Sequence, residues 1–245
     1  MEDATTVAAR NFAYHLQRNS YPGRGLVIGQ STEKDAWLMI YWLMGRSVHS
    51  RNRRLVLQGN VLRTEPVDAR LLGDPSLILY EAMLELPGIY LISNGDQTRT
   101  LYNTLQAGGT FDEALAKRAH EPDAPHYTPR ISAMLTLQEP VGAVTLSILK
   151  ANVVDPAFTD RFTFRPAVPL PGLGVGLTTY QKDGTPLPSF QGEPLLFPCL
   201  GNVETVLDTY WNALNKNYRI AIAVKEILAS GEPGTTIIRN QRSLE

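Results

Sequence analysis

The chain has little of what metal or redox chemistry requires. Cys199 is the only cysteine among 245 residues, so no intrachain disulfide can form, and without a cysteine or histidine close to it we expect no thiolate zinc site. The four histidines, at positions 15, 49, 120 and 126, are scattered and never fall at a metal-binding helical spacing. We therefore predict that the protein has no metal site.

An excess of positive charge and a long apolar run are also missing. Lys+Arg total 23 against 24 for Asp+Glu, a net charge of −1, so no basic surplus is available to cover a polyanion and we expect no nucleic-acid partner. No segment approaches the roughly 20 apolar residues that span a bilayer, so we expect no membrane partner. The acidic start, Met1 to Thr6, lacks the basic and apolar blocks of a secretory signal, which predicts a cytoplasmic protein.

Length and composition are those of a globular protein with a sizeable core. The 245 residues allow one large domain or two small ones, and 43% of them are hydrophobic while 19% are charged. There is no internal repeat, low-complexity tract or long linker. We therefore expect a single domain over residues 1–245.

The hydrophobic pattern predicts many strands and few helices. Helical spacing occurs over residues 4–19, 101–115 and 203–214, and Pro22-Gly23 stops the first of these. Strands are expected over residues 25–29, 37–44, 55–62, 77–86, 89–93, 131–137, 142–151, 162–165, 174–180 and 218–227, with a hairpin turn at Pro87-Gly88. Because few helices cross between strands, the pattern favours an α+β fold built on antiparallel sheet.

The stretch from Gly45 to Arg54 concentrates four arginines and two serines in ten residues, directly after an apolar run. Arginine is a planar fork of donors that binds phosphate or carboxylate bidentately, and serine hydroxyls can fill the remaining acceptor positions of an anion. A solvated basic turn explains the same composition equally well. The stretch alone therefore leaves both interpretations open.

Three more polar clusters stand where predicted strands begin or end. Tyr21-Pro22-Gly23-Arg24 is a tight turn that fixes an arginine before a strand. Residues 93–98 (Ser-Asn-Gly-Asp-Gln-Thr) open a helix, where an anion or polar heterocycle could dock, although a plain helix cap is an equal alternative. Residues 121–131 form a loop stiffened by prolines that carries Glu, Asp, His, Tyr and Arg; the alternative is a Pro-rich surface connection.

Together these clusters resemble the IMP cyclohydrolase family of the archaeal, monofunctional type. The resemblance rests on motifs spread from residue 21 to residue 180: Tyr21 to Arg24, Tyr41 with Gly45-Arg46-Ser47 and Asn52-Arg53, Tyr80, Ser93-Asn94-Gly95, Thr128-Pro129-Arg130-Ile131, and Thr178-Thr179-Tyr180. It implies an α-β-β-α sandwich of the Ntn-hydrolase type with largely antiparallel sheets. Hydrolases of that fold use an N-terminal Thr, Ser or Cys, whereas Glu2 follows Met1 here, so the fold does not imply their chemistry.

The resemblance also implies an activity, the last step of de novo purine synthesis. The carboxamide nitrogen of 5-formamidoimidazole-4-carboxamide ribonucleotide would attack the formyl carbon, and loss of water would give inosinate. Such a reaction needs no cofactor or metal, and such cyclohydrolases are expected to be homo-oligomers. Two other interpretations stay open: an amide hydrolase or related cyclohydrolase on the same scaffold, and a catalytically silent purine-nucleotide-binding module.

The resemblance assigns roles to individual residues. Tyr80 and Arg53, or Arg51 if the loop aligns without a gap, are expected at the reacting amides, with Asp123 slightly favoured over Glu121 as the acid. The substrate-binding residues are expected to be Arg24, Arg46, Ser47, Arg51, Asn52, Asn94, Gly95, Thr128 and Arg130. The 5′-phosphate is expected to bind among Arg24, Arg46, Ser47 and the turn over residues 50–53.

Overall fold

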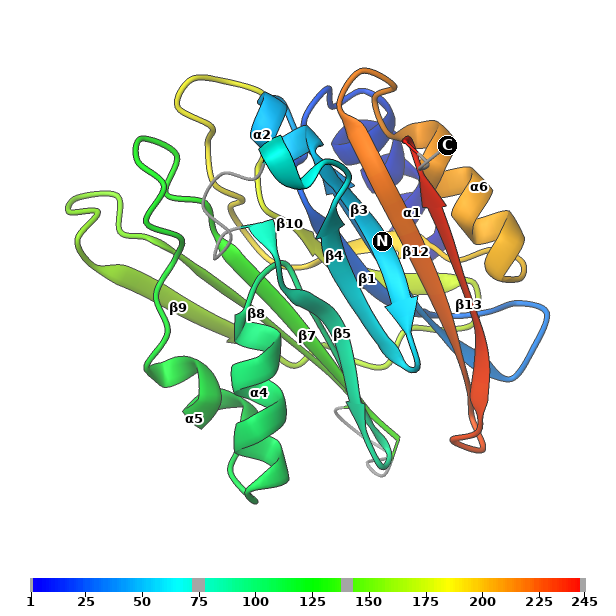
Figure 1. The fold of residues 1–245 in the computed structure, drawn as a ribbon. Helices are drawn as coiled ribbons and strands as arrows, with labels where there is room; N and C mark the ends of the chain where they lie inside the picture. Colours follow the sequence, from blue (N-terminus) through cyan, green and yellow to red (C-terminus); the bar gives the residue numbers. More distant parts are fainter. Residues whose placement is uncertain (1, 72–77, 138–142, 243–245) are drawn as a thin grey trace.

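The strands of this protein form two antiparallel sheets. In the computed structural model, which describes residues 2–71, 78–137 and 143–242, the first sheet has six strands (Figure 1). Their order is β11 (Leu195–Pro198), β10 (Leu173–Thr178), β1 (Gly25–Gln30), β2 (Ala36–Met44), β12 (Arg219–Leu228) and β13 (Pro233–Asn240).

The second sheet is a meander of seven strands in chain order. They are β3 (Arg53–Gln58), β4 (Val61–Pro66), β5 (Glu81–Leu86), β6 (Ile89–Ser93), β7 (Arg130–Thr136), β8 (Val144–Ala151) and β9 (Thr159–Phe164). Every pairing in both sheets is antiparallel. The predicted α+β fold of antiparallel sheets is confirmed.

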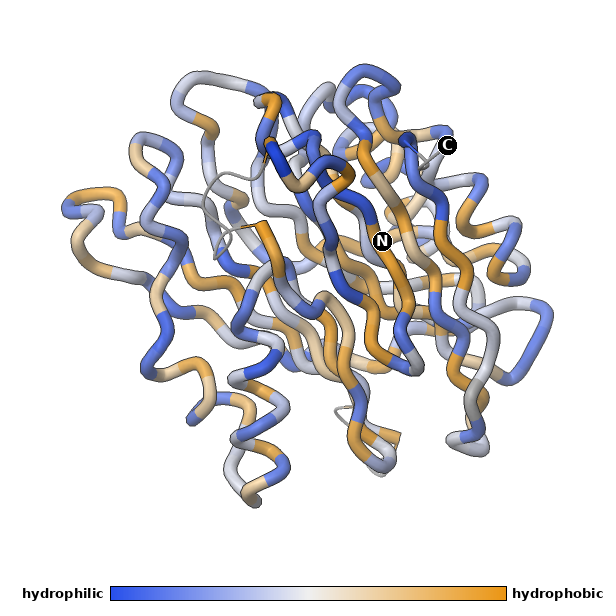
Figure 2. Tube along the Cα trace, in the orientation of Figure 1, coloured by the Kyte–Doolittle hydropathy of each residue, from blue (hydrophilic) through white to orange (hydrophobic). Residues whose placement is uncertain are grey.

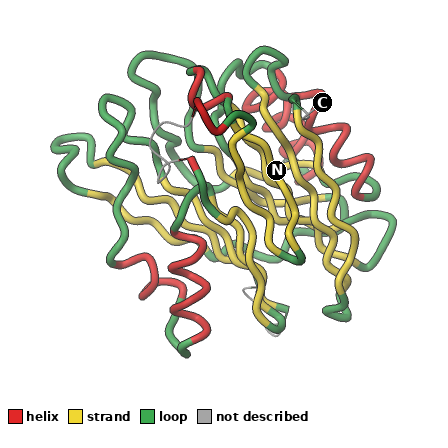
Figure 3. The backbone as a smooth tube through the Cα atoms, in the orientation of Figure 1, coloured by secondary structure: helices red, strands yellow, loops and turns green. Residues whose placement is uncertain are grey.

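Helices cover the outer faces of the sheets, and the main core lies between the sheets (Figure 3). α1 (Ala4–Phe12), which continues as a π-helical segment over Ala13–Gln17, and α6 (Val203–Ala213) pack on the six-stranded sheet. α4 (Gln97–Gln106) and α5 (Phe111–Ala116) pack on the seven-stranded sheet. The layers are therefore helix, sheet, sheet, helix.

The sequence of strand β2 lacks the alternation of apolar and polar residues that a half-exposed strand has, and its burial explains why. All nine of its residues are buried. Met39 and Tyr41 point into the core between the sheets, while Ile40 and Trp42 point toward α1 and α6. A strand covered on both faces has a continuous apolar sequence. Figure 2 shows hydrophobic residues concentrated along the strands.

Several predicted elements differ in their bounds. Residues 55–62 are not one strand but parts of β3 and β4, which are joined at Gly59, whose φ of +57° suits glycine. Residues 101–115 are not one helix, because Gly108, at φ +83°, ends α4 before α5 begins. The strand predicted over 77–86 begins only at Glu81, and residue 77 lies outside the described residues, so Tyr80 precedes the strand.

Two strands were not predicted. β11 is only four residues long and contains Pro198, and β13 is an edge strand of mixed polarity after a turn at Gly231. Edge strands that are short or of mixed polarity have weak hydrophobic alternation, so their sequences give little signal. Two short helices flank the first hairpin of the second sheet: α2 (Val48–Arg51) precedes β3, and a 3₁₀ turn (Ala69–Leu71) follows β4.

Within the described residues, no helix combines the length and the apolar character needed to cross a membrane.

Candidate active site

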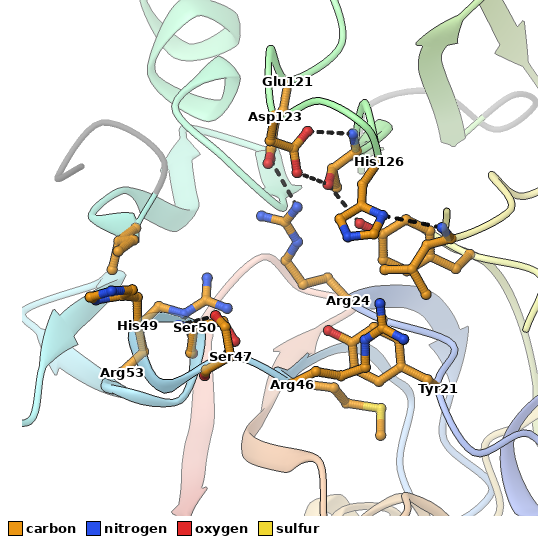
Figure 4. A pocket seen from close by; sticks show the side chains of 16 residues that line it. Tyr21, Arg24, Arg46, Ser47, His49, Ser50, Arg53, Glu121, Asp123 and His126 are labelled. Atoms are coloured by element: carbon orange, nitrogen blue, oxygen red, sulfur yellow. Dashed lines mark hydrogen bonds and ion pairs between the residues drawn. The ribbon is translucent and has the colours of Figure 1, made fainter. Parts of the chain in front are cut away.

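A cavity of about 370 Å³ opens at the edge where several strands of both sheets begin or end. The segment before β1, the segment after β2 and the loop after β10 contribute from the first sheet, because antiparallel pairing brings these ends together. The start of β3 and the loop before β7 contribute from the second. Seven predicted site residues line the cavity: Arg24, Arg46, Ser47, Arg53, Glu121, Asp123 and Thr128 (Figure 4).

Arg24 lies at the centre of this cavity and is paired with an acid. Its Nη2 lies 2.9 Å from Oε1 of Glu121, and its Nη1 donates to the backbone oxygen of Asn94 at 3.0 Å. The two charged side chains are only 9% and 5% exposed. Gly23 makes this placement possible: its φ is +76°, and a Cβ there would lie 2.1 Å from Oγ1 of Thr179.

Burial and pairing act in opposite directions on the two partners. Burial raises the pKa of the Glu121 carboxyl above its ordinary value, and the Arg24 guanidinium opposes that shift. For Arg24, burial disfavours the charged form, but Glu121 together with Tyr80, Tyr41 and Tyr180 outweighs it, and the pKa of Arg24 is raised. The arginine therefore stays charged, and the pKa of the Glu121 carboxyl is shifted toward neutral pH relative to a solvated glutamate. A carboxyl of this kind suits proton transfer.

The second acid of the same loop, Asp123, forms hydrogen bonds with Thr128. Asp123 accepts from the backbone N–H of Thr128 at 2.6 Å through Oδ1 and from the Thr128 hydroxyl at 2.5 Å through Oδ2. Because that hydroxyl has one proton, and it goes to Asp123, the Tyr180 hydroxyl donates to Thr128 Oγ1 at 2.6 Å. Asp123 thus stabilises its own loop and fixes the direction of a hydrogen-bond chain that runs from Tyr180 through Thr128 to Asp123.

Aromatic rings and Arg46 form another wall. Tyr21 and Tyr180 stack with ring centroids 5.9 Å apart and an interplanar angle of 21°. The Arg46 guanidinium lies 5.1 Å from the Tyr21 ring centroid. It also donates to Asp183 at 2.6 Å and to the backbone oxygen of Gly184 at 3.0 Å. Arg46 therefore ties the loop after β10 to the cavity.

Helix α2 supplies the opposite wall. Ser47 caps it by accepting from the backbone N–H of Ser50 at 3.1 Å. Arg53 donates from Nε to the Ser50 carbonyl at 2.8 Å and, within the described part of the chain, forms no ion pair. Arg53 as a residue is only 6% exposed, and its guanidinium has donors available to an anion.

Asn94, Gly95 and Arg130 lie behind the cavity rather than in its wall. The Asn94 side chain is fully buried; it donates to the Pro129 carbonyl at 2.8 Å and accepts from the Ile131 N–H at 2.9 Å. Arg130 donates to Asp96 at 2.6 Å, and a Cβ on Gly95 would lie 2.6 Å from Arg130 Nη1. These residues join the start of α4 to the start of β7.

Asp96 gives this junction a measurable pH dependence. Burial opposes its ionisation, but Arg118 and Arg130 outweigh that effect and lower the pKa of Asp96. A carboxyl with a lowered folded-state pKa stabilises the fold above its ordinary pKa, and that contribution is lost as pH falls through the lowered value. We expect Asp96→Asn to cost about 1 kcal/mol at pH 7, since the pair is half exposed and screened. Urea unfolding at pH 7 and pH 3 should show the deficit shrinking in acid; a constant deficit would contradict this account.

Three predicted residues have other surroundings. Tyr80 is buried, and its hydroxyl lies 2.6 Å from that of Tyr41, with both phenols within electrostatic reach of Arg24. Asn52 bridges to the backbone of Asp68, donating to its carbonyl at 2.7 Å and accepting from its N–H at 2.8 Å. Arg51 faces a neighbouring pocket that is also lined by Arg53.

Some cavity residues were given no role by sequence reasoning. Tyr21 and Tyr180 were part of the matched motifs, but their stacking joins residues 159 positions apart and has no local signal. His126 accepts the Leu187 N–H at 3.2 Å through Nδ1, which leaves its other ring nitrogen to carry the proton of the neutral form. Asp183 was missed because nothing near it in sequence marks it as the partner of Arg46.

The described residues contain no group of three or more His, Cys, Asp or Glu side chains arranged to hold a metal ion. The buried thiol of Cys199 lies in the core under α6, away from the cavity, and burial raises its pKa to about 12. The groups that the cavity offers to a ligand are guanidinium, carboxyl, hydroxyl, imidazole and aromatic ones.

The fold and cavity define a class: a protein of two antiparallel sheets between helical layers, with an arginine-rich site that contains a buried carboxyl. Comparison with known families then identifies it. The model of the IMP cyclohydrolase-like protein family matches residues 21–230, and the chain belongs to that family. The family inferred from the sequence motifs is confirmed. A search among curated proteins found no match.

Proposed function

We propose that this protein is an IMP cyclohydrolase that closes the ring of 5-formamidoimidazole-4-carboxamide ribonucleotide to give inosinate and water. The observation that carries the proposal is the buried Arg24–Glu121 pair in the cavity of a chain that belongs to this family. Both reacting groups sit in one substrate molecule. The enzyme therefore has to hold the reactive rotamer, stabilise the developing oxyanion and move protons.

We assign proton transfer to Glu121 rather than Asp123. Both oxygens of Asp123 are occupied by Thr128, whereas Glu121 pairs with Arg24 and has a pKa raised by burial. In the ring closure, the carboxamide nitrogen bonds to the formyl carbon and loses one proton. The formamido nitrogen loses its own proton as it forms a double bond to that carbon, and the formyl oxygen leaves as water with these two protons. The Glu121 carboxyl, whose pKa burial raises, can accept the first proton and return it to the departing oxygen.

Arg24 and Arg53 take the electrostatic roles in this proposal. Arg24 faces Glu121, so its charge can stabilise the oxyanion that forms on the formyl oxygen. We favour Arg53 over Arg51 near the ligand because Arg53 lines the cavity and Arg51 does not. Tyr80 acts indirectly, through its hydroxyl contact with Tyr41 close to Arg24, so we propose it as a positioning residue.

We also propose that the layered architecture is of the Ntn-hydrolase type. The support is the helix, sheet, sheet, helix order and the family match. The cavity groups proposed to act here are internal side chains, so this site does not depend on an N-terminal nucleophile.

Product analysis separates the proposal from its alternatives. Purified protein is incubated with the formamido ribonucleotide, and the products are resolved by chromatography. Ring closure yields inosinate, whereas an amide hydrolase would release formate and the 5-amino compound. A silent binding module would bind inosinate without turning over the substrate. Either of these last two results would overturn the proposed function.

A further inference from the structure

A second pocket, of about 310 Å³, adjoins the cavity on the far side of Arg53. It lies where the starts of β3 and β12 meet the end of β13, segments that Figure 1 shows close together beside α2. We call it the cation pocket. It is lined by Arg51, Arg53, Lys216, Arg219 and Arg242, together with Ile220 and Gln241.

The cations of this pocket lack the partners that the other arginines have. Of the chain's 17 arginines, 11 form ion pairs in the part of the chain that the structure describes, and four of the other six line this pocket. Within the part of the chain that the structure describes, no carboxylate is among its lining residues. Five cations therefore lie close together without a described carboxylate beside them, although the chain as a whole has a net charge of −1. Electrostatic repulsion among the cations opposes this arrangement.

The pocket is held in shape by contacts between the two sheets. Asn240 of β13 donates to the Leu55 carbonyl at 3.0 Å and accepts the Leu55 N–H at 2.8 Å, which fixes β13 against β3. Arg219 donates to the Trp211 carbonyl at 2.7 Å and to Gln241 at 3.2 Å, and its guanidinium lies 4.1 Å from the Trp211 ring centroid. Burial and the nearby Arg239 lower the pKa of Arg219, a cost that a bound anion would relieve.

We infer that the cation pocket is a binding site for a phosphoryl group, with Arg53 shared between it and the main cavity. Arginine forks and a lysine ammonium around one pocket suit the several acceptor oxygens of a phosphate. Arg24 and Arg46 already bind Glu121 and Asp183, whereas the cations of this pocket form no ion pair within the described residues. The phosphoryl group can be the 5′-phosphate of a nucleotide in the main cavity or belong to a separate phosphorylated molecule.

Lys216→Glu tests this inference with little risk to the fold, because Lys216 is exposed and forms no hydrogen bond in the described part of the chain. Lys117→Glu, an equal charge reversal at an exposed position after α5, is the matched control. Titration with inorganic phosphate by calorimetry should show Kd increased at least about tenfold in Lys216→Glu. The control should match the wild type. Arg242→Glu, also exposed, should repeat the effect of Lys216→Glu.

Two further arms identify the source of the phosphoryl group. If the phosphoryl group is the nucleotide's own 5′-phosphate, inorganic phosphate should compete with inosinate for binding. Lys216→Glu should then weaken the binding of inosinate but not the binding of inosine. If it is a separate molecule, phosphate and inosinate bind together, and Lys216→Glu leaves inosinate affinity unchanged. Equal phosphate affinities in wild type, Lys216→Glu and Lys117→Glu would overturn the inference. The nucleotide arm rests on the proposed function, but phosphate binding needs no turnover, so a failure of ring closure would leave that measurement informative.

Discussion

Replacing Glu121 with glutamine should lower kcat for ring closure by about 100-fold or more, the range over which positioned acids and bases contribute to catalysis. Glutamine keeps the size of the side chain and an oxygen that can accept from Arg24, but it cannot exchange a proton. The loss should therefore appear in kcat, with inosinate binding little changed. Stopped or continuous assays of inosinate formation would measure it.

The matched control for this substitution is Glu193→Gln, an exposed position in the loop between β10 and β11. It makes the same chemical change away from the cavity and should leave kcat unaltered. A Glu121→Gln enzyme within twofold of the wild type would remove Glu121 from the reaction. Asp123→Asn would then be the next variant to assay, since Asp123 is the second carboxyl that lines the cavity.

Replacing Arg24 with methionine should destabilise the protein by about 3–5 kcal/mol, because it leaves the buried Glu121 carboxyl without its charged partner. The Asn94 carbonyl also loses a donor. Equilibrium unfolding in urea at neutral pH would measure the loss. Activity should disappear as well, since Arg24 faces the reacting groups in our proposal.

The stability deficit of Arg24→Met should depend on pH, and the sign of that dependence follows from the pKa of Glu121. Burial raises that pKa and Arg24 opposes the shift, so removing Arg24 raises the folded-state pKa further. A folded state that holds a proton which the unfolded state releases loses stability as pH rises. Wild type and Arg24→Met lose this stability in parallel up to the raised pKa of Glu121 in the wild type, so the deficit of Arg24→Met should grow as pH rises above that pKa.

The double variant Arg24→Met/Glu121→Leu separates structure from chemistry. Replacing a buried ion pair with apolar side chains of similar volume is often neutral or stabilising, so the double variant should recover most of the lost stability. It should recover no activity. A double variant that is both stable and active would show that the pair serves the fold alone.

The sequence motifs anticipated much of this site because its residues stand in short segments at strand ends. Arg24, Arg46 and Arg53 come directly before or after apolar runs, and the antiparallel pairing of those runs brings them to one cavity. Glu121, Asp123 and Thr128 lie within eight residues in a loop that the prolines already marked as rigid. For such residues, local pattern and position in the fold agree.

What the sequence could not predict depends on contacts between distant segments. Which of the two acids is free for chemistry depends on Thr128, which occupies Asp123, and on Arg24, which pairs with Glu121 from 97 residues away. Asn94 stands in a turn whose composition suits ligand binding, yet its side chain is hydrogen-bonded to the backbone of residues 129 and 131. The cation pocket joins residues 51–53 to residues 216–242 and leaves no mark in either segment alone.

The most direct test of the account is the rate at which the wild-type protein converts the formamido ribonucleotide to inosinate, compared with Glu121→Gln and with buffer alone. We predict inosinate formation that is proportional to wild-type enzyme concentration and reduced about 100-fold or more in Glu121→Gln. A wild-type rate equal to that in buffer, from protein that is folded and binds inosinate, would contradict the account.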